Sequence, residues 1–329
     1  MKTLLLARTV KSYWATNFAK KRVSKVFAPF DSSPFWRILG GIFSPVLYFF
    51  VTFAGFLKSK NFDLVIAADP RIGIIFGILK RVFGRKTQIL VHQLILSEPK
   101  NNFKERILKL AFSEINGAVV NSSDEARFFS KRFTKTKFYF VPLHSDPRCF
   151  ELSKTKRVDG YIFSGGGAER DFETLVKAAK KNNQKFLIVT FSKKNLARMS
   201  LPKNLEVKFN VREGEYFKLI ANSKFVVVPL KKTGRSAGQT TVVQAMSTGK
   251  AVIATNVPGL TDYIENGRTG ILVGSESIKD LADNIGKLLK NSSELSKISK
   301  AALEFAQRNF TYRVYDMRIG KVIKSFIKV

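Results

Sequence analysis

The sequence predicts an α/β protein built from two doubly wound, parallel-sheet domains. Three observations predict this fold. The 329 residues are enough for two domains with substantial cores. Short apolar runs, typical of strands buried on both faces, alternate with helical patterns through the chain. A small-residue loop between Leu230 and Gln239 joins a strand to a helix, an arrangement suited to phosphate binding.

The first half of the chain carries five predicted strands, each a short apolar run. They are Lys2–Ala7, Phe62–Ala67, Gln88–Val91, Gly117–Val120 and Phe138–Val141. Helices are predicted between them at Ile72–Leu79 and Lys104–Phe112, and Asn121–Glu125 has the polar pattern of a helix N-cap. Asp69 and His92 follow two of the strands, at the edge of the sheet where ligands bind in such folds. We expect residues 1–147 to form the first domain.

Residues Ile38–Leu57 contain no charge and are rich in aromatic side chains. Their length alone would allow a membrane span. A span would, however, separate the first strand from its sheet, and Gly40, Gly41 and Pro45 disfavour a continuous helix. A helix that covers the sheet and dips one face into a membrane surface is the interpretation we favour. A fully buried helix is the first alternative, and a true span is the last.

The second domain is predicted over residues 158–310. Pro142, Pro147 and the charged run Lys154–Arg157 predict a linker over Pro142–Val158. A strand at Tyr161–Phe163 leads into a run of glycines that includes Gly166 and Gly167. A helix at Glu173–Lys180 follows, and further strands are expected at Phe186–Thr190, Leu205–Lys208, Phe225–Val228 and Ala251–Ala254. Residues 312–329 have the apolar stripe of a final helix.

The loop after Leu230 contains Arg235, Ser236 and Gly238, and a helix should begin at Gln239 or Thr240. Gly249 is its expected C-cap. The N-terminus of such a helix offers free N–H groups and the positive end of the helix dipole. The sequence therefore predicts a phosphate site at Gly238, Gln239 and Thr240.

The stretch Lys231–Val273 resembles the donor-binding region of GT-B glycosyltransferases, especially glycosyltransferase family 4. The resemblance rests on Val243–Met246, Gly249–Ala254 and the closing run Asn266–Val273. It departs from the family at Ser236 and Gln244, where glutamates are usual. The resemblance implies two Rossmann-like domains that face each other across a cleft, with the C-terminal helix crossing back to the first domain.

The resemblance also implies roles for particular residues. Glu169-Arg170 matches a Glu-Lys pair of the family whose lysine contacts the donor diphosphate. Gly165 stands where the family has an arginine, and Arg235 or Lys232 would compensate for the loss of that positive charge. Gln244 matches the residue that holds the ribose, Ser236 matches the residue at the sugar ring, and the nucleobase pocket falls near Asn210–Arg212. The predicted donor-binding residues are Arg170, Gly166, Gly167, Arg235, Ser236, Gly238, Gln239, Thr240, Gln244 and Arg212.

Two residues of the first domain are the predicted catalytic groups. His92 matches the histidine that the family places at the mouth of the cleft. Asp69 is the acid available as a general base if the reaction inverts. Ser236 cannot stabilise positive charge at the sugar ring as a glutamate could. Retention and inversion of the configuration at the anomeric carbon therefore both stay open, with a slight preference for retention.

The net charge of +32 is extreme and is spread over both halves of the chain. Such a field suits an anionic partner: lipid head groups, nucleic acid or a phosphorylated substrate. Trp14, Phe18 and Phe27 interleave with the basic segment Lys11–Lys25. We predict a cytoplasmic protein that lies peripherally on the inner face of a membrane and does not use nucleic acid as its partner. A lysine-rich composition without a selected partner is the alternative.

No metal or cofactor is predicted beyond the donor. The single cysteine, Cys149, excludes an intrachain disulfide and fits a reducing compartment. Neither His92 nor His144 has zinc-ligand spacing, and no Asp-x-Asp motif is present. The sequence predicts a metal-independent glycosyltransferase that uses a UDP- or GDP-sugar and a lipid-linked or surface-polysaccharide acceptor. The alternative is a non-catalytic protein on a degenerate GT-B scaffold that binds nucleic acid or an anionic membrane, favoured by the missing glutamates and the charge.

Overall fold

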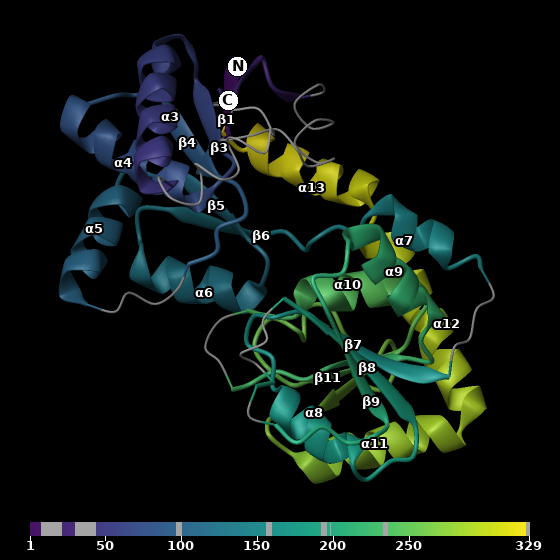
Figure 1. Ribbon diagram of the computed structural model, residues 1–329. Helices are drawn as coiled ribbons and strands as arrows, with labels where there is room; N and C mark the ends of the chain where they lie inside the picture. Colours follow the sequence, from purple (N-terminus) through teal and green to yellow (C-terminus); the bar gives the residue numbers. More distant parts are fainter. Residues whose placement is uncertain are drawn as a thin grey trace. The chain divides into compact units, whose positions relative to one another are not determined.

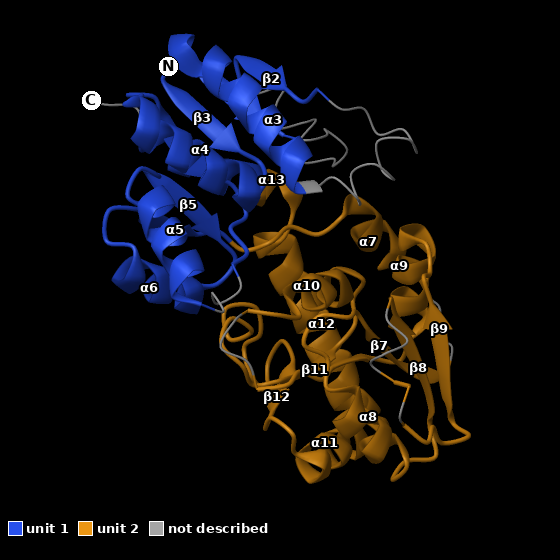
Figure 2. Cartoon of the chain, turned by 60° about the vertical axis from the view of Figure 1, so that its left-hand side comes forward, with its two compact units in different colours: residues 1–141, 316–329 blue, residues 142–315 orange. Residues whose placement is uncertain are grey.

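The computed structural model describes residues 1–7, 22–29, 44–96, 101–155, 160–191, 196–197, 199–232 and 236–326. The chain forms two compact units, coloured separately in Figure 2. Unit 1 comprises Met1–Val141 with Asp316–Val329, and unit 2 comprises Pro142–Tyr315. Each unit is built on a six-stranded sheet whose neighbouring strands all pair in parallel. The predicted α/β class with two Rossmann-like halves is confirmed.

The sheet of unit 1 has the order β2-β1-β3-β4-β5-β6 (Figure 1). Its strands are β1 (Thr3–Leu6), β2 (Lys25–Phe27), β3 (Leu64–Ala67), β4 (Gln88–Val91), β5 (Gly117–Val120) and β6 (Lys137–Phe140). Its helices are α3 (Ser44–Lys58), the short η1 (Ser59–Asn61), α4 (Pro70–Phe83), α5 (Asn102–Phe112) and α6 (Ser123–Arg132). All five predicted strands are present, and β2 is an addition.

Both faces of the unit 1 sheet are buried, as the continuous apolar strands require. Because successive side chains of a strand point to opposite faces, Leu4 and Leu6 of β1 join one core with residues of α3 to α6. On strand β5, a side chain at Gly117 would collide with Phe326, which follows the C-terminal helix and also contacts the Tyr139 ring. The C-terminal segment therefore packs on this sheet.

The sheet of unit 2 has the order β12-β11-β10-β7-β8-β9. Its strands are β7 (Tyr161–Gly165), β8 (Lys185–Thr190), β9 (Leu205–Phe209), β10 (Val226–Val228), β11 (Val252–Thr255) and β12 (Ile271–Val273). Its helices are α7 (Pro147–Leu152), α8 (Phe172–Ala179), α9 (Glu213–Asn222), α10 (Gln239–Ser247), α11 (Ile278–Lys290) and α12 (Ser292–Asn309). Gly249 has φ +73°, as expected of the residue that ends α10.

Two apolar cores lie on opposite faces of the unit 2 sheet. Val226 and Val228 join a core with α10, whereas Val227 between them joins a core with α8 and α11. Helix α12 contributes to both cores, through Ala302 on one side and Ile298 on the other. This double coverage holds the strand ends firmly in place, which is what a site at those ends needs.

Helix α13 (Tyr312–Lys324) begins in unit 2, and its residues from Asp316 onward belong to unit 1 (Figure 2). Asp316 accepts two hydrogen bonds of 3.0 Å from the Arg22 guanidinium. Arg22 thus fastens the N-terminal part of unit 1 to α13. The rest of the basic run, from Lys11 to Lys21, lies outside the described residues.

The predicted linker, Pro142–Val158, is not a linker in the structure. It belongs to unit 2 and contains α7. The Asp146 side chain accepts a hydrogen bond from the backbone N–H of Arg148, and Pro147 occupies the first turn. Asp followed by Pro is a helix-start signal as well as a loop signal, which is why composition alone misplaced this segment.

Helix α3 covers the aromatic part of the uncharged stretch, while residues 38–43 lie outside the described residues. The helix is not fully buried, because Phe49 and Phe50 are exposed although Tyr48 and Val51 are buried. This exposure contradicts the fully buried alternative. Among the described residues, no helix combines the length and apolarity that a membrane span requires.

Candidate functional site

A cavity of about 360 Å³ opens in unit 2 beside the loops that follow β7 and β10. These two strands are neighbours in the sheet, and the strand order reverses between them. The loops that leave their carboxyl ends therefore diverge, and open α/β sheets bind ligands at such a point. The lining residues are Gly166, Gly167, Ala168, Arg170, Phe191, Val211, Glu213, Tyr216, Phe217, Gly238, Thr240, Thr241 and Gln244.

Arg170 is the buried cation of this cavity, with 7% of its surface exposed. Its guanidinium donates to the Gly165 carbonyl at 2.8 Å, the Ala168 carbonyl at 3.1 Å and the Thr241 hydroxyl at 3.0 Å. All three acceptors are neutral, and Arg170 forms no ion pair with the described residues. Burial lowers the pKa of the Arg170 side chain, but an arginine stays charged at physiological pH. A desolvated positive charge among neutral groups favours a bound anion.

Two glycines allow the guanidinium and the backbone to approach each other. Gly166 has φ +108°, and a Cβ there would lie 2.5 Å from a terminal nitrogen of Arg170. A Cβ on Gly165 would lie 2.2 Å from the Tyr216 hydroxyl oxygen. Tyr216 therefore fills the space beside Gly165, and a larger side chain at this position would not fit without displacing that ring.

The N-terminus of α10 lines the cavity next to Arg170. Gly238 precedes the helix with φ +86° and, as a glycine, offers no side chain of its own to cap the helix N-terminus. The N–H groups of a first helical turn have no partner within the helix, so they are available to an anion. Thr240, Thr241 and Gln244 of this helix line the cavity.

An apolar wall completes the cavity and includes Phe191, Val211, Tyr216 and Phe217. Tyr216 packs edge-on against Phe163, with ring centroids 5.3 Å apart, and its hydroxyl lies 3.5 Å from that of Thr241. Burial raises the pKa of the Tyr216 hydroxyl, so this group is neutral and can donate a hydrogen bond.

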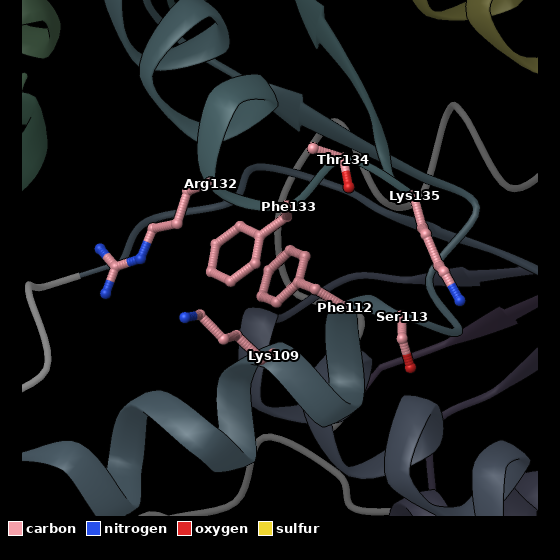
Figure 3. A pocket seen from close by; sticks show the side chains of 7 residues that line it. All are labelled: Lys109, Phe112, Ser113, Arg132, Phe133, Thr134 and Lys135. Atoms are coloured by element: carbon pink, nitrogen blue, oxygen red, sulfur yellow. The ribbon is translucent and has the colours of Figure 1, made fainter.

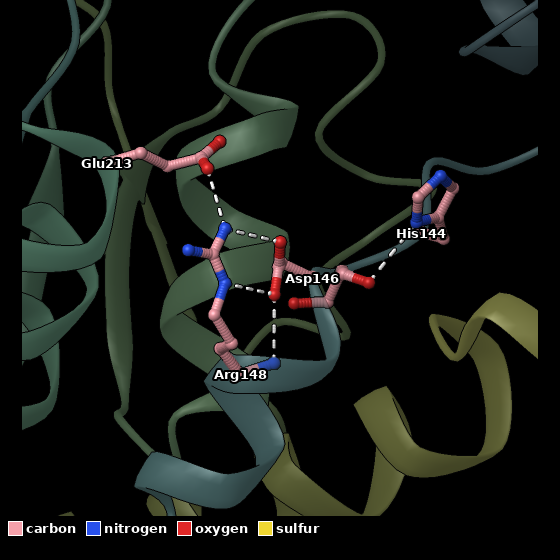
Figure 4. Close-up of polar contacts among 5 residues, drawn as sticks. His144, Asp146, Arg148 and Glu213 are labelled. Carbon is pink, nitrogen blue, oxygen red and sulfur yellow. Dashed lines mark hydrogen bonds and ion pairs between the residues drawn. The ribbon is translucent and has the colours of Figure 1, made fainter. Parts of the chain in front are cut away.

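Arg148 connects α7 to the rim of the cavity (Figure 4). Its guanidinium donates to Asp146 at 2.7 Å and to Glu213 at 2.6 Å, and it lies 5.0 Å from the centroid of the Phe217 ring. The hydrogen bond from Arg148 holds the pKa of Asp146 below its ordinary value. Ion pairs this exposed add little stability, but both Glu213 and Phe217, which Arg148 contacts, line the cavity.

His144 packs in unit 2 beside two tyrosines. Its ring centroid lies 4.8 Å from that of Tyr315 and 5.7 Å from that of Tyr312. Burial lowers the pKa of the imidazole, and its Nδ1 lies 3.2 Å from the Ser145 carbonyl oxygen. A neutral, packed imidazole fits a structural role.

Six of the predicted donor-binding residues line the cavity: Gly166, Gly167, Arg170, Gly238, Thr240 and Gln244. Three others do not. Arg212 is exposed at the start of α9, Ser236 is half-buried before α10, and the Gln239 side chain is buried. Arg235 lies outside the described residues.

The aromatic wall was missed because the sequence analysis assigned no helix between β9 and β10. The signal was present: Phe217, Ile220 and Ala221 form a buried face at helical spacing. That pattern predicts α9, and with it Tyr216 and Phe217 next to the proposed base pocket near Asn210–Arg212.

Asp69 and His92 both lie in unit 1, after the adjacent parallel strands β3 and β4. Asp69 is the N-cap of α4 and accepts hydrogen bonds from Arg71 at 2.8–2.9 Å and from the Tyr48 hydroxyl at 3.1 Å. Burial would raise the pKa of Asp69, but the hydrogen bonds and charge of Arg71 outweigh it, and the pKa lies below its ordinary value. A carboxylate so engaged is a poor proton acceptor, so this arrangement favours a capping role.

His92 is buried, with 2% of its surface exposed, and its backbone N–H donates to the Ala67 carbonyl at 2.8 Å. That bond continues the β3–β4 pairing by one residue and fixes the backbone at the strand end. Its catalytic role stays a prediction.

A second cavity, of about 230 Å³, lies in unit 1 where α5 and α6 end (Figure 3). Lys109, Arg132 and Lys135 line it around the stacked rings of Phe112 and Phe133. The cations face two helix C-termini, whose carbonyl groups carry partial negative charge, and Arg132 and Lys109 also pair with Glu105. Two of the three cations thus share one acidic partner, and we assign no ligand to this cavity.

Within the described part of the chain, no three or more His, Cys, Asp and Glu side chains are grouped so that they could hold a metal ion.

Comparisons with known proteins agree with the geometry of unit 2. Residues 167–291 match the model of the family Glycosyl transferases group 1. Poly(ribitol-phosphate) alpha-N-acetylglucosaminyltransferase of Staphylococcus aureus is 27% identical over 208 residues, which cover 58% of this chain and 40% of that protein. Uncharacterized glycosyltransferase MJ1069 of Methanocaldococcus jannaschii is 25% identical over 308 residues, covering 82% and 77%. A sucrose synthase of Solanum tuberosum is 31% identical over 113 residues, and the match spans 14% of its length.

Among solved structures, Alr3699/HepE of Anabaena in complex with UDP superposes with a TM-score of 0.69 at 16% identity, covering 99% of this chain and all of that one. S. aureus TarM superposes with a TM-score of 0.64 at 18% identity, covering 86% and 59%. The protein therefore has the GT-B fold of glycosyltransferases. Its residues 167–291 relate it to the glycosyl transferases group 1, which confirms the resemblance expected from the sequence; the assignment to family 4 stays a prediction.

Proposed function

We propose that the protein is a glycosyltransferase that takes its sugar from a nucleotide-diphosphate sugar, a UDP-sugar in particular. The observation that carries the proposal is the buried Arg170, which hydrogen-bonds Thr241 in the first turn of α10 and lines the cavity of unit 2 without an ionic partner among the described residues. The support for UDP is that Alr3699/HepE, which shares the fold, was solved with UDP and with UDP-glucose.

The transfer breaks the bond between the sugar's anomeric carbon and the terminal phosphate oxygen, whose electron pair stays on the diphosphate. The acceptor oxygen forms the new bond and loses its proton. Arg170 and the N–H groups of α10 would neutralise the charge that grows on the leaving diphosphate. Since these groups supply positive charge themselves, we propose that the reaction needs no metal ion.

The remaining lining residues suit the rest of a nucleotide. Phe191, Val211 and Phe217 offer an apolar surface to a nucleobase. Gln244 offers an amide that can hydrogen-bond the ribose hydroxyls. Thr240 lies one turn before Gln244 on the same side of α10, nearer the phosphate end.

The acceptor is proposed to be membrane-associated, either a lipid-linked sugar or a growing surface glycan, at the inner face of the membrane. The net charge of +32 supports this choice, because a strongly basic protein concentrates near anionic lipids. The S. aureus relative is named for transfer to poly(ribitol-phosphate), itself a polyanion.

The test is an assay of hydrolysis and transfer with UDP-, GDP- and ADP-sugars, run with EDTA and, as control, with EDTA saturated by magnesium. We expect turnover of a UDP-sugar at equal rates in both conditions. If EDTA abolished the activity and added magnesium or manganese restored it, the proposal that the reaction needs no metal ion would be overturned. If no sugar nucleotide turns over and calorimetry detects no UDP binding, the alternative of a non-catalytic protein on this scaffold is favoured.

A further inference from the structure

The outer face of α3 is apolar along its length. Val46, Phe49, Phe50, Phe53 and Leu57 follow the spacing i, i+3, i+4, i+7 and i+11, which places them on one stripe of a helix. All but the half-buried Phe53 are exposed, with 60% of Phe50 and 57% of Leu57 accessible. The opposite stripe holds the buried Tyr48, Val51 and Phe56. A helix at a protein surface in water normally carries polar residues on its outer face, and this one does not.

The apolar face continues onto the neighbouring helix α4. Val82 and Phe83 at the end of α4 are 67% and 61% exposed. The Phe83 ring lies 5.7 Å from that of Phe56, so the ends of the two helices meet. Single exposed apolar residues are ordinary, but a contiguous set over two helices marks an interaction surface. We name this set, Val46, Phe49, Phe50, Leu57, Val82 and Phe83, the apolar ridge.

Positive charge gathers at the end of the ridge where the two helices finish. Lys58 is the last residue of α3 and Lys60 lies in η1, while Arg85 and Lys86 follow α4. The Arg85 guanidinium lies 4.8 Å from the centroid of the Phe56 ring. Between residues 44 and 96 the acids are Asp63 and Asp69, and Asp69 is occupied by Arg71. Exposed aromatic residues beside cations, with almost no acids, match a surface of anionic lipid.

We infer that the apolar ridge docks on an anionic lipid bilayer, with its side chains inserted at the level of the head groups and Lys58, Lys60 and Lys86 against lipid phosphates. This inference deepens the proposed function by naming the surface that would bring unit 1 to a membrane-bound acceptor. It differs from the expectation based on sequence, which assigned the charge to Lys11–Lys25. Arg22 of that run is engaged by Asp316 instead.

The experiment is vesicle sedimentation with the full chain. At physiological salt, wild-type protein should bind vesicles that contain phosphatidylglycerol. It should bind vesicles of pure phosphatidylcholine only weakly. High salt should weaken this binding without abolishing it, because screening acts on the charges and not on the inserted side chains. The double variant Phe50→Ser with Leu57→Ser should lower the partition coefficient at least about tenfold, since two large apolar side chains no longer leave water.

The matched control is Phe103→Ser with Phe128→Ser, which removes two exposed aromatic side chains from α5 and α6. This variant should bind within about twofold of wild type. Calorimetry with UDP, whose proposed site is in unit 2, should be the same for all three proteins, which separates failure of the membrane inference from failure of the proposed function. Equal vesicle binding by wild type and the ridge variant would overturn the inference. The inference would also be overturned if the wild-type protein did not bind vesicles but formed a dimer, and the ridge variant were a monomer. The ridge would then be the contact surface between two copies of the chain.

Discussion

Arg170→Ala is expected to weaken UDP binding by about 1.5–3 kcal/mol, the usual contribution of hydrogen bonds to charged groups, which is roughly ten- to a hundredfold in Kd. Arg170 is buried, is held by the Gly165 and Ala168 carbonyls and the Thr241 hydroxyl, and is the lining residue whose charge suits a diphosphate. Isothermal titration calorimetry with UDP measures the effect directly.

Two further variants sharpen this measurement. Arg170→Lys keeps a positive charge but loses the planar fork, so its affinity should fall between wild type and alanine. Arg308→Ala removes an exposed arginine of α12 that does not line the cavity, and it should bind UDP as wild type does. Unchanged UDP affinity of Arg170→Ala, with a normal thermal unfolding curve, would remove Arg170 from the site.

Gly165→Ala is expected to destabilise unit 2 by about 1–3 kcal/mol, the usual cost of forcing a methyl group into a packed interior. The added Cβ would lie 2.2 Å from the Tyr216 hydroxyl oxygen and 2.8 Å from the Phe163 ring. The Tyr216 ring would have to move, and the cavity wall would move with it. Chemical denaturation measures the loss in free energy of unfolding, and calorimetry measures the accompanying loss of UDP affinity.

Combining Gly165→Ala with Tyr216→Phe should recover part of the stability, because the hydroxyl that collides with the new methyl group is gone. The control is Gly286→Ala, inside α11, where an added Cβ meets nothing within 4 Å. Alanine is the better helix former there, and the variant should be as stable as wild type or up to about 1 kcal/mol more stable. A Gly165→Ala protein with wild-type stability and UDP affinity would show that Tyr216 is not confined as described.

The strands could be predicted closely because they are buried on both faces. Gln88–Val91 and Gly117–Val120 are found with the predicted bounds, since each is a short apolar run between polar residues. Helices with a polar outer face were harder to recognise. Helix α9 was not predicted, although its buried residues Phe217 and Ile220 carry the helical period. The Asp146-Pro147 pair starts a helix but was interpreted as a linker.

The phosphate end of the candidate site could be predicted because backbone geometry defines it. A glycine turn before a helix creates the same N–H groups whatever side chains follow, and Gly238 and Thr240 lie where expected. Arg170 was placed by the resemblance and does line the cavity. The aromatic wall was missed because α9 was not predicted, and with it the packing of Tyr216 against Phe163 of β7. The role of Asp69 as a general base stays a prediction, and the contacts of its carboxylate with Arg71 and Tyr48 could be found only in the structure.

The path of α13 has a consequence for the order in which the chain folds during synthesis. Unit 2 is one continuous segment, whereas unit 1 joins residues from both ends of the chain. Until the segment after Tyr315 has been made, the face of the unit 1 sheet that receives Phe326 lacks that cover. While unit 2 is being synthesised, the earlier-made part of unit 1 therefore still exposes apolar strand surface, the state in which aggregation begins. The N-terminal part of unit 1 is thus synthesised first, but its fold is completed only when the C-terminal residues are added.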